Sequence, residues 1–146
     1  MKKIISIMLM ALAFVTTLSA QQLEKLFDKY MEDERFNYVY QKKTSMMDRL
    51  TDLGNVETWG IDKSHTSTGR QMITLNSTDK SLDESFTQEV KNALQADKYE
   101  QVSIVRNGKN RVETYERKSD KGISKVSFIK NPGNIMVSLN TYAPTK

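Results

Sequence analysis

Residues 107–139 read NGKNRVETYERKSDKGISKVSFIKNPGNIMVSL. Three turn signals punctuate this stretch: Asn107-Gly108, Asp120-Lys-Gly122 and Asn131-Pro-Gly-Asn134. Glycine and asparagine tolerate the positive φ angles that tight hairpin turns require, and proline pre-sets the first position of a turn. The stretch therefore predicts that the four strand-like runs after Tyr99 form an antiparallel meander.

The two later turns set the pairing of these strands. Centring them on Asp120-Lys121 and Pro132-Gly133 predicts four cross-strand pairs: Lys118–Ile123, Tyr115–Val126, Phe128–Val137 and Val126–Leu139. One face of the meander then collects Tyr115, Val126, Phe128, Val137 and Leu139. The other face carries Thr114, Ser127 and Ser138 in a row, with Glu116 opposite Lys125. This pattern is typical of an antiparallel sheet with one buried face and one wetter face.

Two amphipathic helices are predicted before the meander. In the first, over residues 22–34, apolar side chains recur at spacings of three and four: Leu23, Leu26, Phe27, Tyr30 and Met31. The second opens at Ser81-Leu-Asp-Glu84, which resembles a capping box. Its apolar side holds Leu82, Phe86, Val90, Ala93 and Leu94.

The segment between these helices predicts shorter elements. Residues 36–41 are aromatic and β-branched enough for a strand. Ser45 then opens a short helix that carries Met46-Met47 as core residues and ends at Gly54. Residues 56–61 and 71–76 read as two strands around a polar loop over 63–70.

The predicted order is helix, then strand–helix–strand–strand–helix–strand, then three further strands. We expect an α+β fold with helices packed on one face of a mostly antiparallel sheet. The middle six elements match the order of a ferredoxin-like split βαβ unit. A ferredoxin-like core extended by a C-terminal β-meander is one arrangement compatible with this order.

The first twenty residues resemble a secretory signal peptide. Lys2-Lys3 precede an apolar run, Ile4 to Val15, and a small polar stretch ends at Ala20. The run is shorter than the roughly 20 residues of a transmembrane helix. We expect residues 1–20 to be removed on export, leaving residues 21–146 as a single periplasmic or secreted domain.

The charge is unevenly distributed. Without residues 1–20 the net charge falls from +4 to +2, which disfavours nucleic acid as a partner. Residues 21–99 hold eleven basic and fourteen acidic side chains, whereas residues 100–146 hold nine and four. The basic residues of the meander are Arg106, Lys109, Arg111, Arg117, Lys118, Lys121, Lys125 and Lys130. They could bind a polyanion or lipid headgroups, but the predicted register divides them between both faces and the turns, which favours a role in solubility and edge protection.

Candidates for chemistry are few. The chain has no cysteine, which excludes disulfides, thiolate nucleophiles and zinc–sulfur sites. His65 lies in Asp62-Lys-Ser-His-Thr-Ser67, but a Ser–His–Asp triad is assembled by the fold and not by neighbours in sequence. We expect His65 to be an exposed loop residue.

The acidic and aromatic candidates also have simpler explanations. Asp28 and Glu32 share one helix face, but nearby lysines predict a solvated, salt-bridged surface. The segment 79–83 lacks the glycine and the glutamate of a calcium loop, so we expect Asp79 and Ser81 to serve as turn and cap residues. Trp59, Tyr38 and Tyr40 could stack on sugars, yet aromatic residues in strands are more often core. No glycine-rich phosphate loop is present, and we expect neither a cofactor nor a metal.

The chain resembles small exported α+β proteins of unknown function that are common in Bacteroidetes. The resemblance rests on Leu26-Phe-Asp-Lys-Tyr30, on Phe36-Asn-Tyr-Val39, on the predicted helix bearing Met46-Met47, and on a mature start at Gln21-Gln22. It implies a non-enzymatic domain of the cell envelope and carries no catalytic residue. Many such proteins have a lipid-anchor cysteine, which this chain lacks.

The sequence thus predicts a non-catalytic binding or interaction domain. Its expected partner is an envelope protein or a polyanionic glycan or lipid. The alternative is a hydrolase with a carboxylate or Ser/His site that the fold assembles.

Overall fold

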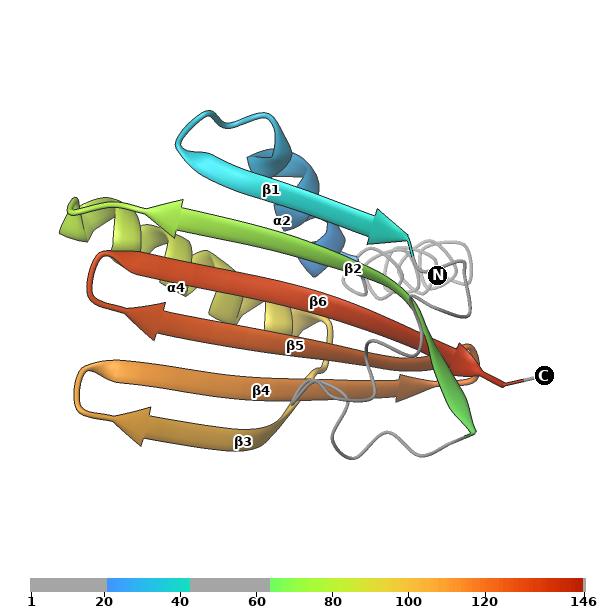
Figure 1. Cartoon of the computed structure of the whole chain (residues 1–146). Coiled ribbons are helices and arrows are strands. Elements are labelled where there is room, and N and C mark those ends of the chain that lie inside the picture. The colour runs from blue at the N-terminus through green and yellow to red at the C-terminus, as the bar shows by residue number, and fades with distance from the viewer. Residues whose placement is uncertain (1–20, 43–63, 146) are drawn as a thin grey trace, which may run out of the picture.

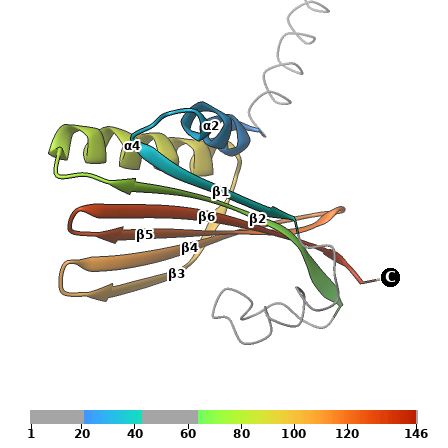
Figure 2. The same cartoon turned by 45° about the horizontal axis from the view of Figure 1, so that its top comes forward.

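The computed structural model describes residues 21–42 and 64–145, which form two helices on one face of a six-stranded sheet (Figures 1 and 2). The α+β architecture is therefore confirmed. In chain order the elements are α2 (Gln22–Met31), β1 (Phe36–Lys42), β2 (His65–Asn76), α4 (Lys80–Ala96), β3 (Glu100–Asn107), β4 (Asn110–Ser119), β5 (Gly122–Asn131) and β6 (Asn134–Pro144). The predicted signal peptide, the helix from Ser45 to Gly54 with its two methionines, and the strand over 56–61 lie outside the described residues. Neither described helix is long and apolar enough to cross a membrane.

The sheet has the strand order β1-β2-β6-β5-β4-β3, with every neighbouring pair antiparallel. A ferredoxin-like core would place the strand that follows the second helix, here β3, beside β1. In the described part of the chain β1 pairs with β2 alone, and β3 lies at the opposite edge of the sheet. That arrangement is therefore wrong. The order of elements does not specify pairing, and β6 takes the place on the other side of β2 because its alternate residues, Ile135 and Val137 among them, are apolar enough for the centre of the sheet.

The predicted register of the meander is confirmed. All four expected pairs are present. The five apolar residues of the predicted inner face are buried against the helices. All three predicted turns hold a glycine at positive φ: Gly108 at 60°, Gly122 at 141° and Gly133 at 76°.

The other face of the meander is less wet than expected. Ser127 lies between Thr114 and Ser138, and Glu116 pairs with Lys125 at 3.8 Å, as predicted. Ser138 is nevertheless fully buried. Its Oγ accepts hydrogen bonds from Arg70 and Asn140, at 3.3 and 3.2 Å, which satisfy the buried hydroxyl. Burial also lowers the pKa of Lys125 below the ordinary lysine value.

An aromatic cluster joins both helices to the sheet. Tyr30 of α2, Phe36 of β1 and Phe86 of α4 pack with ring centroids 4.2 to 5.1 Å apart. The other buried side chains of the helices are Leu23, Leu26 and Phe27 of α2, with Val90, Ala93 and Leu94 of α4. These are the apolar stripes that the sequence predicted, apart from the half-exposed Met31 and the partly buried Leu82.

The helix predicted over 22–34 ends earlier, at Met31. The side chain of Asp33 accepts a hydrogen bond from the backbone N–H of Arg35 at 3.0 Å, and its carbonyl accepts one from the N–H of Phe36 at 2.9 Å. Aspartate favours such local turns over a continuing helix. The chain therefore turns at Asp33 directly into β1.

Aspartates also cap both helices. Asp79, and not Ser81, is the N-cap of α4, since its carboxylate accepts the N–H groups of Ser81 and Leu82, at 2.9 and 3.3 Å. The buried carboxylate of Asp97, at the end of α4, accepts the first N–H groups of α2, from Gln22 and Leu23, at 2.9 and 2.8 Å. Asp97 thereby ties the start of one helix to the end of the other.

Strand β2 begins six residues before the predicted position, so the expected polar loop over 63–70 is wrong from His65 onward. Thr66 and Ser67 pair with the end of β6, and the register shifts between Ser67 and Gly69. Polar, threonine-rich residues are compatible with a strand where a neighbouring strand supplies the backbone hydrogen bonds.

Candidate functional site

One row of residues across the helix-covered face of the sheet changes from apolar to cationic halfway across the strands. In β1, β2 and β6 the row consists of Phe36, Leu75 and Ile135, which are all buried. In β5, β4 and β3 it continues as Lys130, Arg111 and Arg106. Three cations thus lie directly opposite one another on three neighbouring strands.

These cations line a hollow of about 310 Å³ at one end of the sheet. The β3–β4 turn, the β5–β6 turn and the beginning of α4 all lie at this end, on the left of Figures 1 and 2. Its lining is Asp83, Arg106, Gly108, Lys109, Arg111, Lys130, Asn131, Pro132 and Gly133. We call this site the basic hollow; it contains four cationic side chains and one carboxylate.

The cationic row is electrostatically unfavourable by itself. Neighbouring strands are about 4.8 Å apart, and like charges directly opposite each other destabilise a sheet. Within the described part of the chain, Arg111 is the one cation of the row with a carboxylate partner. Arg106 donates to the carbonyl of Gly108 at 3.5 Å, and Lys130 donates to the hydroxyl of Thr87 on α4 at 3.4 Å. The hollow therefore keeps an excess of positive charge.

Glu113 lies beside the cationic row, two residues from Arg111 on the same face of β4. Its fully buried carboxylate is 2.8 Å from the ammonium of Lys91 and 2.7 Å from the guanidinium of Arg111, and it accepts a hydrogen bond from the Tyr115 hydroxyl at 3.2 Å. Burial acts to raise the pKa of Glu113, but the hydrogen bonds from Lys91 and Arg111 outweigh it and hold that pKa below the ordinary value. Burial and the adjacent carboxylate raise the pKa of Tyr115 to about 12.

Glu113 also positions Arg111. Its Oε1 accepts from both Nε and Nη2 of Arg111, at 3.0 and 2.7 Å. A guanidinium has five N–H donors, so three remain for other acceptors. The arginine is thus held in one orientation without using up its donors, which is how a preorganised anion site is built.

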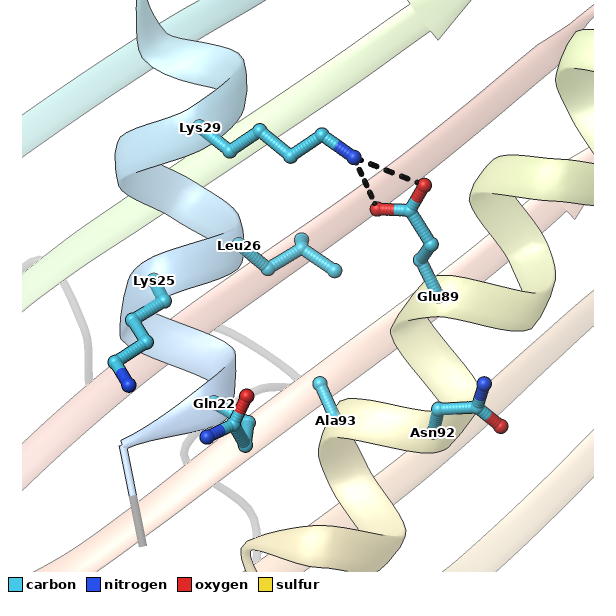
Figure 3. A pocket seen from close by; sticks show the side chains of 7 residues that line it. All are labelled: Gln22, Lys25, Leu26, Lys29, Glu89, Asn92 and Ala93. Atoms are coloured by element: carbon cyan, nitrogen blue, oxygen red, sulfur yellow. Dashed lines mark hydrogen bonds and ion pairs between the residues drawn. The ribbon is translucent and has the colours of Figure 1, made fainter. Parts of the chain in front are cut away.

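A second hollow lies between the two helices (Figure 3). Lys29 of α2 reaches across to Glu89 of α4 and forms an ion pair of 2.8 Å, while Leu26 and Ala93 line the space below. The charges of Lys29 and Glu89 therefore satisfy each other. Asp28 on α2 and Glu32, directly after its end, are both exposed, as the sequence indicated.

The histidine is placed differently from expectation. His65 is partly buried and lies at the start of β2, opposite Pro144, and not in a loop. Its Nδ1 is 2.9 Å from Oγ of the adjacent Ser64. Within residues 21–42 and 64–145, no three His, Asp or Glu side chains gather as a metal site would require.

The aromatic candidates separate from one another. Tyr38 packs against the core and donates to the side chain of Gln71 at 3.4 Å, whereas Tyr40 is 59% exposed, so the expectation of a core role is wrong for Tyr40. Trp59 lies outside the described residues.

The basic hollow is the site that the sequence interpretation missed. The eight cations of the meander were expected to be divided between both faces and the turns. The predicted register nevertheless already places Arg111 opposite Lys130, and the Asn107-Gly108 turn places Arg106 opposite Arg111. Extending the predicted register to the charged positions would have revealed the row. Lys118 and Lys121 do lie apart from it, near the β4–β5 turn.

Neither a family model, nor a curated protein, nor a solved structure matches this chain.

Proposed function

We propose that this protein is a non-catalytic binding domain of the cell envelope that holds an anionic group in the basic hollow. The observation that carries the proposal is the row of three opposed cations on β3, β4 and β5. Such a row costs stability in the absence of an anion, and a bound anion would neutralise it. The predicted signal peptide supports a location in the envelope.

The side chains of the hollow suit phosphate, sulfate or carboxylate groups. Arginine presents planar pairs of N–H donors that match these groups, and lysine adds a compact point charge. In the envelope such groups are carried by acidic glycans and by lipid headgroups. The hollow has one carboxylate of its own, Asp83, at the α4 side, so we expect the ligand to bind against the strands.

The hydrolase alternative receives less support. A carboxylate mechanism for glycoside hydrolysis uses two acidic groups about 5–10 Å apart across the bond. The basic hollow is lined by one acid and four cations, a composition that favours holding an anion over cleaving a glycosidic bond.

The test compares two charge-matched double variants. Lys109→Gln with Lys130→Gln removes two cations from the hollow, whereas Lys118→Gln with Lys121→Gln removes two from the opposite end of the meander. Binding is measured by calorimetry with inorganic phosphate and a sulfated oligosaccharide, and by sedimentation with phosphatidylglycerol vesicles.

We expect the hollow variant to lose affinity by about tenfold or more, since each lysine near an anionic surface contributes about 1 kcal/mol. The control variant should retain most of its affinity. Binding to the oligosaccharide alone identifies a glycan, and binding to vesicles alone identifies a lipid. Equal losses in both variants, or no binding to any of the three probes, would refute the proposal.

A further inference from the structure

Strand β3 is exposed along its whole length. All eight residues from Glu100 to Asn107 are exposed, and three of them are large and apolar: Val102 at 54%, Ile104 at 52% and Val105 at 58%. Within the described residues β3 pairs with β4 alone, and it forms the edge of the sheet that lies farthest from α2 (Figures 1 and 2). Its outer backbone N–H and C=O groups face away from β4.

Such an edge is normally protected. Proteins prevent an exposed edge from pairing with other chains by means of proline, inward-pointing charges, bulges or a covering helix. In β3 the register shift between Gln101 and Ser103 interrupts the first half, but Ser103 to Asn107 pair regularly with β4. This regular half contains Ile104 and Val105 and no proline.

Each residue of this regular half extends a row of the sheet. Ile104 continues the row of Glu113 and Phe128 on the helix-covered face, and Arg106 continues the cationic row on the same face. Val105 lies on the opposite face, where it continues an apolar row through Val112 and Ile129 to Met136. A further strand would therefore meet two apolar positions and one cationic position in succession.

We propose that the outer edge of β3 accepts an extended, acidic segment of a partner protein as a seventh strand. Backbone hydrogen bonds supply affinity in such strand addition, and alternate side chains supply specificity. The partner segment places an acidic residue opposite Arg106 and apolar residues opposite Val105 and Ile104. In the antiparallel sense of this sheet, that segment reads acidic–apolar–apolar from its N-terminus.

Charge distinguishes this partner from a second copy of the chain. A symmetric antiparallel pair of β3 strands centred on Val105 would place Arg106 of each copy opposite Ile104 of the other. The two Arg106 side chains would then lie diagonally across the new pair of strands, about 7–8 Å apart on the same face. Like charges across an interface oppose association, so the structure favours an acidic partner strand.

The probe is a nine-residue, threonine-rich peptide with glutamate, valine and isoleucine at its centre, in that order. The matched peptide has lysine in place of the glutamate. Affinity is measured by fluorescence anisotropy on the full chain, and the binding position is measured by amide NMR shifts and hydrogen exchange. We expect the glutamate peptide to bind at least about fivefold tighter, because opposite charges across strands stabilise and like charges destabilise.

Two variants locate the site. Ile104→Thr with Val105→Thr keeps β-branched side chains but removes apolar surface, and it should weaken peptide binding at least about fivefold. Val39→Thr makes one such change on β1, at the other edge of the sheet, where Val39 is 47% exposed, and it should leave binding unchanged.

Protection of β3 amides by the glutamate peptide, together with both variant results, would establish the site. Equal binding of the two peptides, protection at β1 instead of β3, or no binding would overturn the proposal. A dimer that buries β3 in the unliganded protein would assign the edge to a second copy and would also overturn it. Arg106 is shared with the basic hollow, but the protection of β3 amides and the effect of the Ile104→Thr, Val105→Thr variant report strand addition. Either result can be obtained whether or not the anion proposal fails.

Discussion

The two halves of the sheet have the same backbone geometry but different surroundings. The covered half consists of β1, β2, β6 and the apolar positions of β5, and the outer half consists of β3, β4 and Lys130 of β5. On the helix-covered face, the row Ile73, Val137 and Phe128 is at most 1% exposed. The same row continues into Glu113, which is buried but charged, and ends at Ile104, which is 52% exposed. Side chains in the covered half remove apolar surface from water, at about 25 cal/mol per Å². Exposed side chains of the outer half, such as Ile104, remain available to other molecules.

The transition between the two halves lies at α4. Its residues Phe86 and Val90 pack on the apolar core, while Thr87 and Lys91, on the neighbouring side, contact Lys130 and Glu113. One helix therefore covers the core with one stripe and borders the basic hollow with the next. We infer that the covered half determines the stability of the fold, and that the outer half can change with little cost to it.

The most severe test of this comparison is Phe86→Ala. Phe86 is fully buried between Tyr30 and Phe36, so its loss leaves a cavity at the junction of both helices and the sheet. We expect the free energy of unfolding to fall by about 3–5 kcal/mol. Urea denaturation followed by circular dichroism measures the change.

The matched substitution is Val102→Ala on β3, which should cost less than about 0.5 kcal/mol because the side chain is already exposed. Comparable losses at Phe86 and Val102 would mean that stability is shared evenly across the sheet, contrary to the comparison.

The second test is made at the border between the halves. Glu113→Gln keeps the shape of the side chain but leaves Lys91 and Arg111 without their carboxylate. Breaking a buried ion pair costs about 3–5 kcal/mol, and the partial exposure of both cations reduces this to about 2 kcal/mol. Urea denaturation at pH 7 measures the loss.

The pH dependence gives an independent check. The pKa of Glu113 is lower in the folded state than in the unfolded state, so the unfolded chain binds more protons as the solution is acidified. The contribution of Glu113 is complete above the ordinary glutamate pKa, near 4.3, and is lost as the pH falls through the lower folded value. The difference in stability between the wild-type protein and Glu113→Gln should therefore shrink below about pH 4. A difference that stays constant down to pH 2 would contradict this role.

Local patterns predicted the covered half well. The stripe of α2, the stripe of α4 and the register of the meander depend on nearby residues and on turns such as Pro132-Gly133, which the sequence displays directly. Burial follows from these periodicities because the apolar side chains of each element lie on one side, and packing those sides together removes them from water.

Features that depend on contacts between distant residues could not be predicted in this way. Asp97 caps α2 across 74 positions, and β6 pairs with β2 although more than 50 residues separate the strands. Neither contact leaves a periodic signal. The basic hollow is intermediate: its row follows from the register, but its enclosure depends on the position of α4 beside Lys130, which is a tertiary contact.

The smallest expected effect is also the most specific to function. Arg106 lies opposite Arg111 at the edge of the sheet, and among the described residues no carboxylate pairs with it. Arg106→Gln removes this repulsion and keeps a long polar side chain, so we expect the free energy of unfolding to rise by about 0.2–0.5 kcal/mol. Lys118→Gln is the control, since Lys118 lies 3.4 Å from Glu116 and its removal should leave stability unchanged or slightly lower.

If the basic hollow binds an anion, Arg106→Gln should also weaken that binding, so that stability and affinity move in opposite directions. Such opposition is expected where residues are retained for binding at a cost to the fold. A loss of stability in Arg106→Gln would instead show that the cation supports the edge strand, and the contrast between a stabilising half and a ligand-binding half would then not hold at this position.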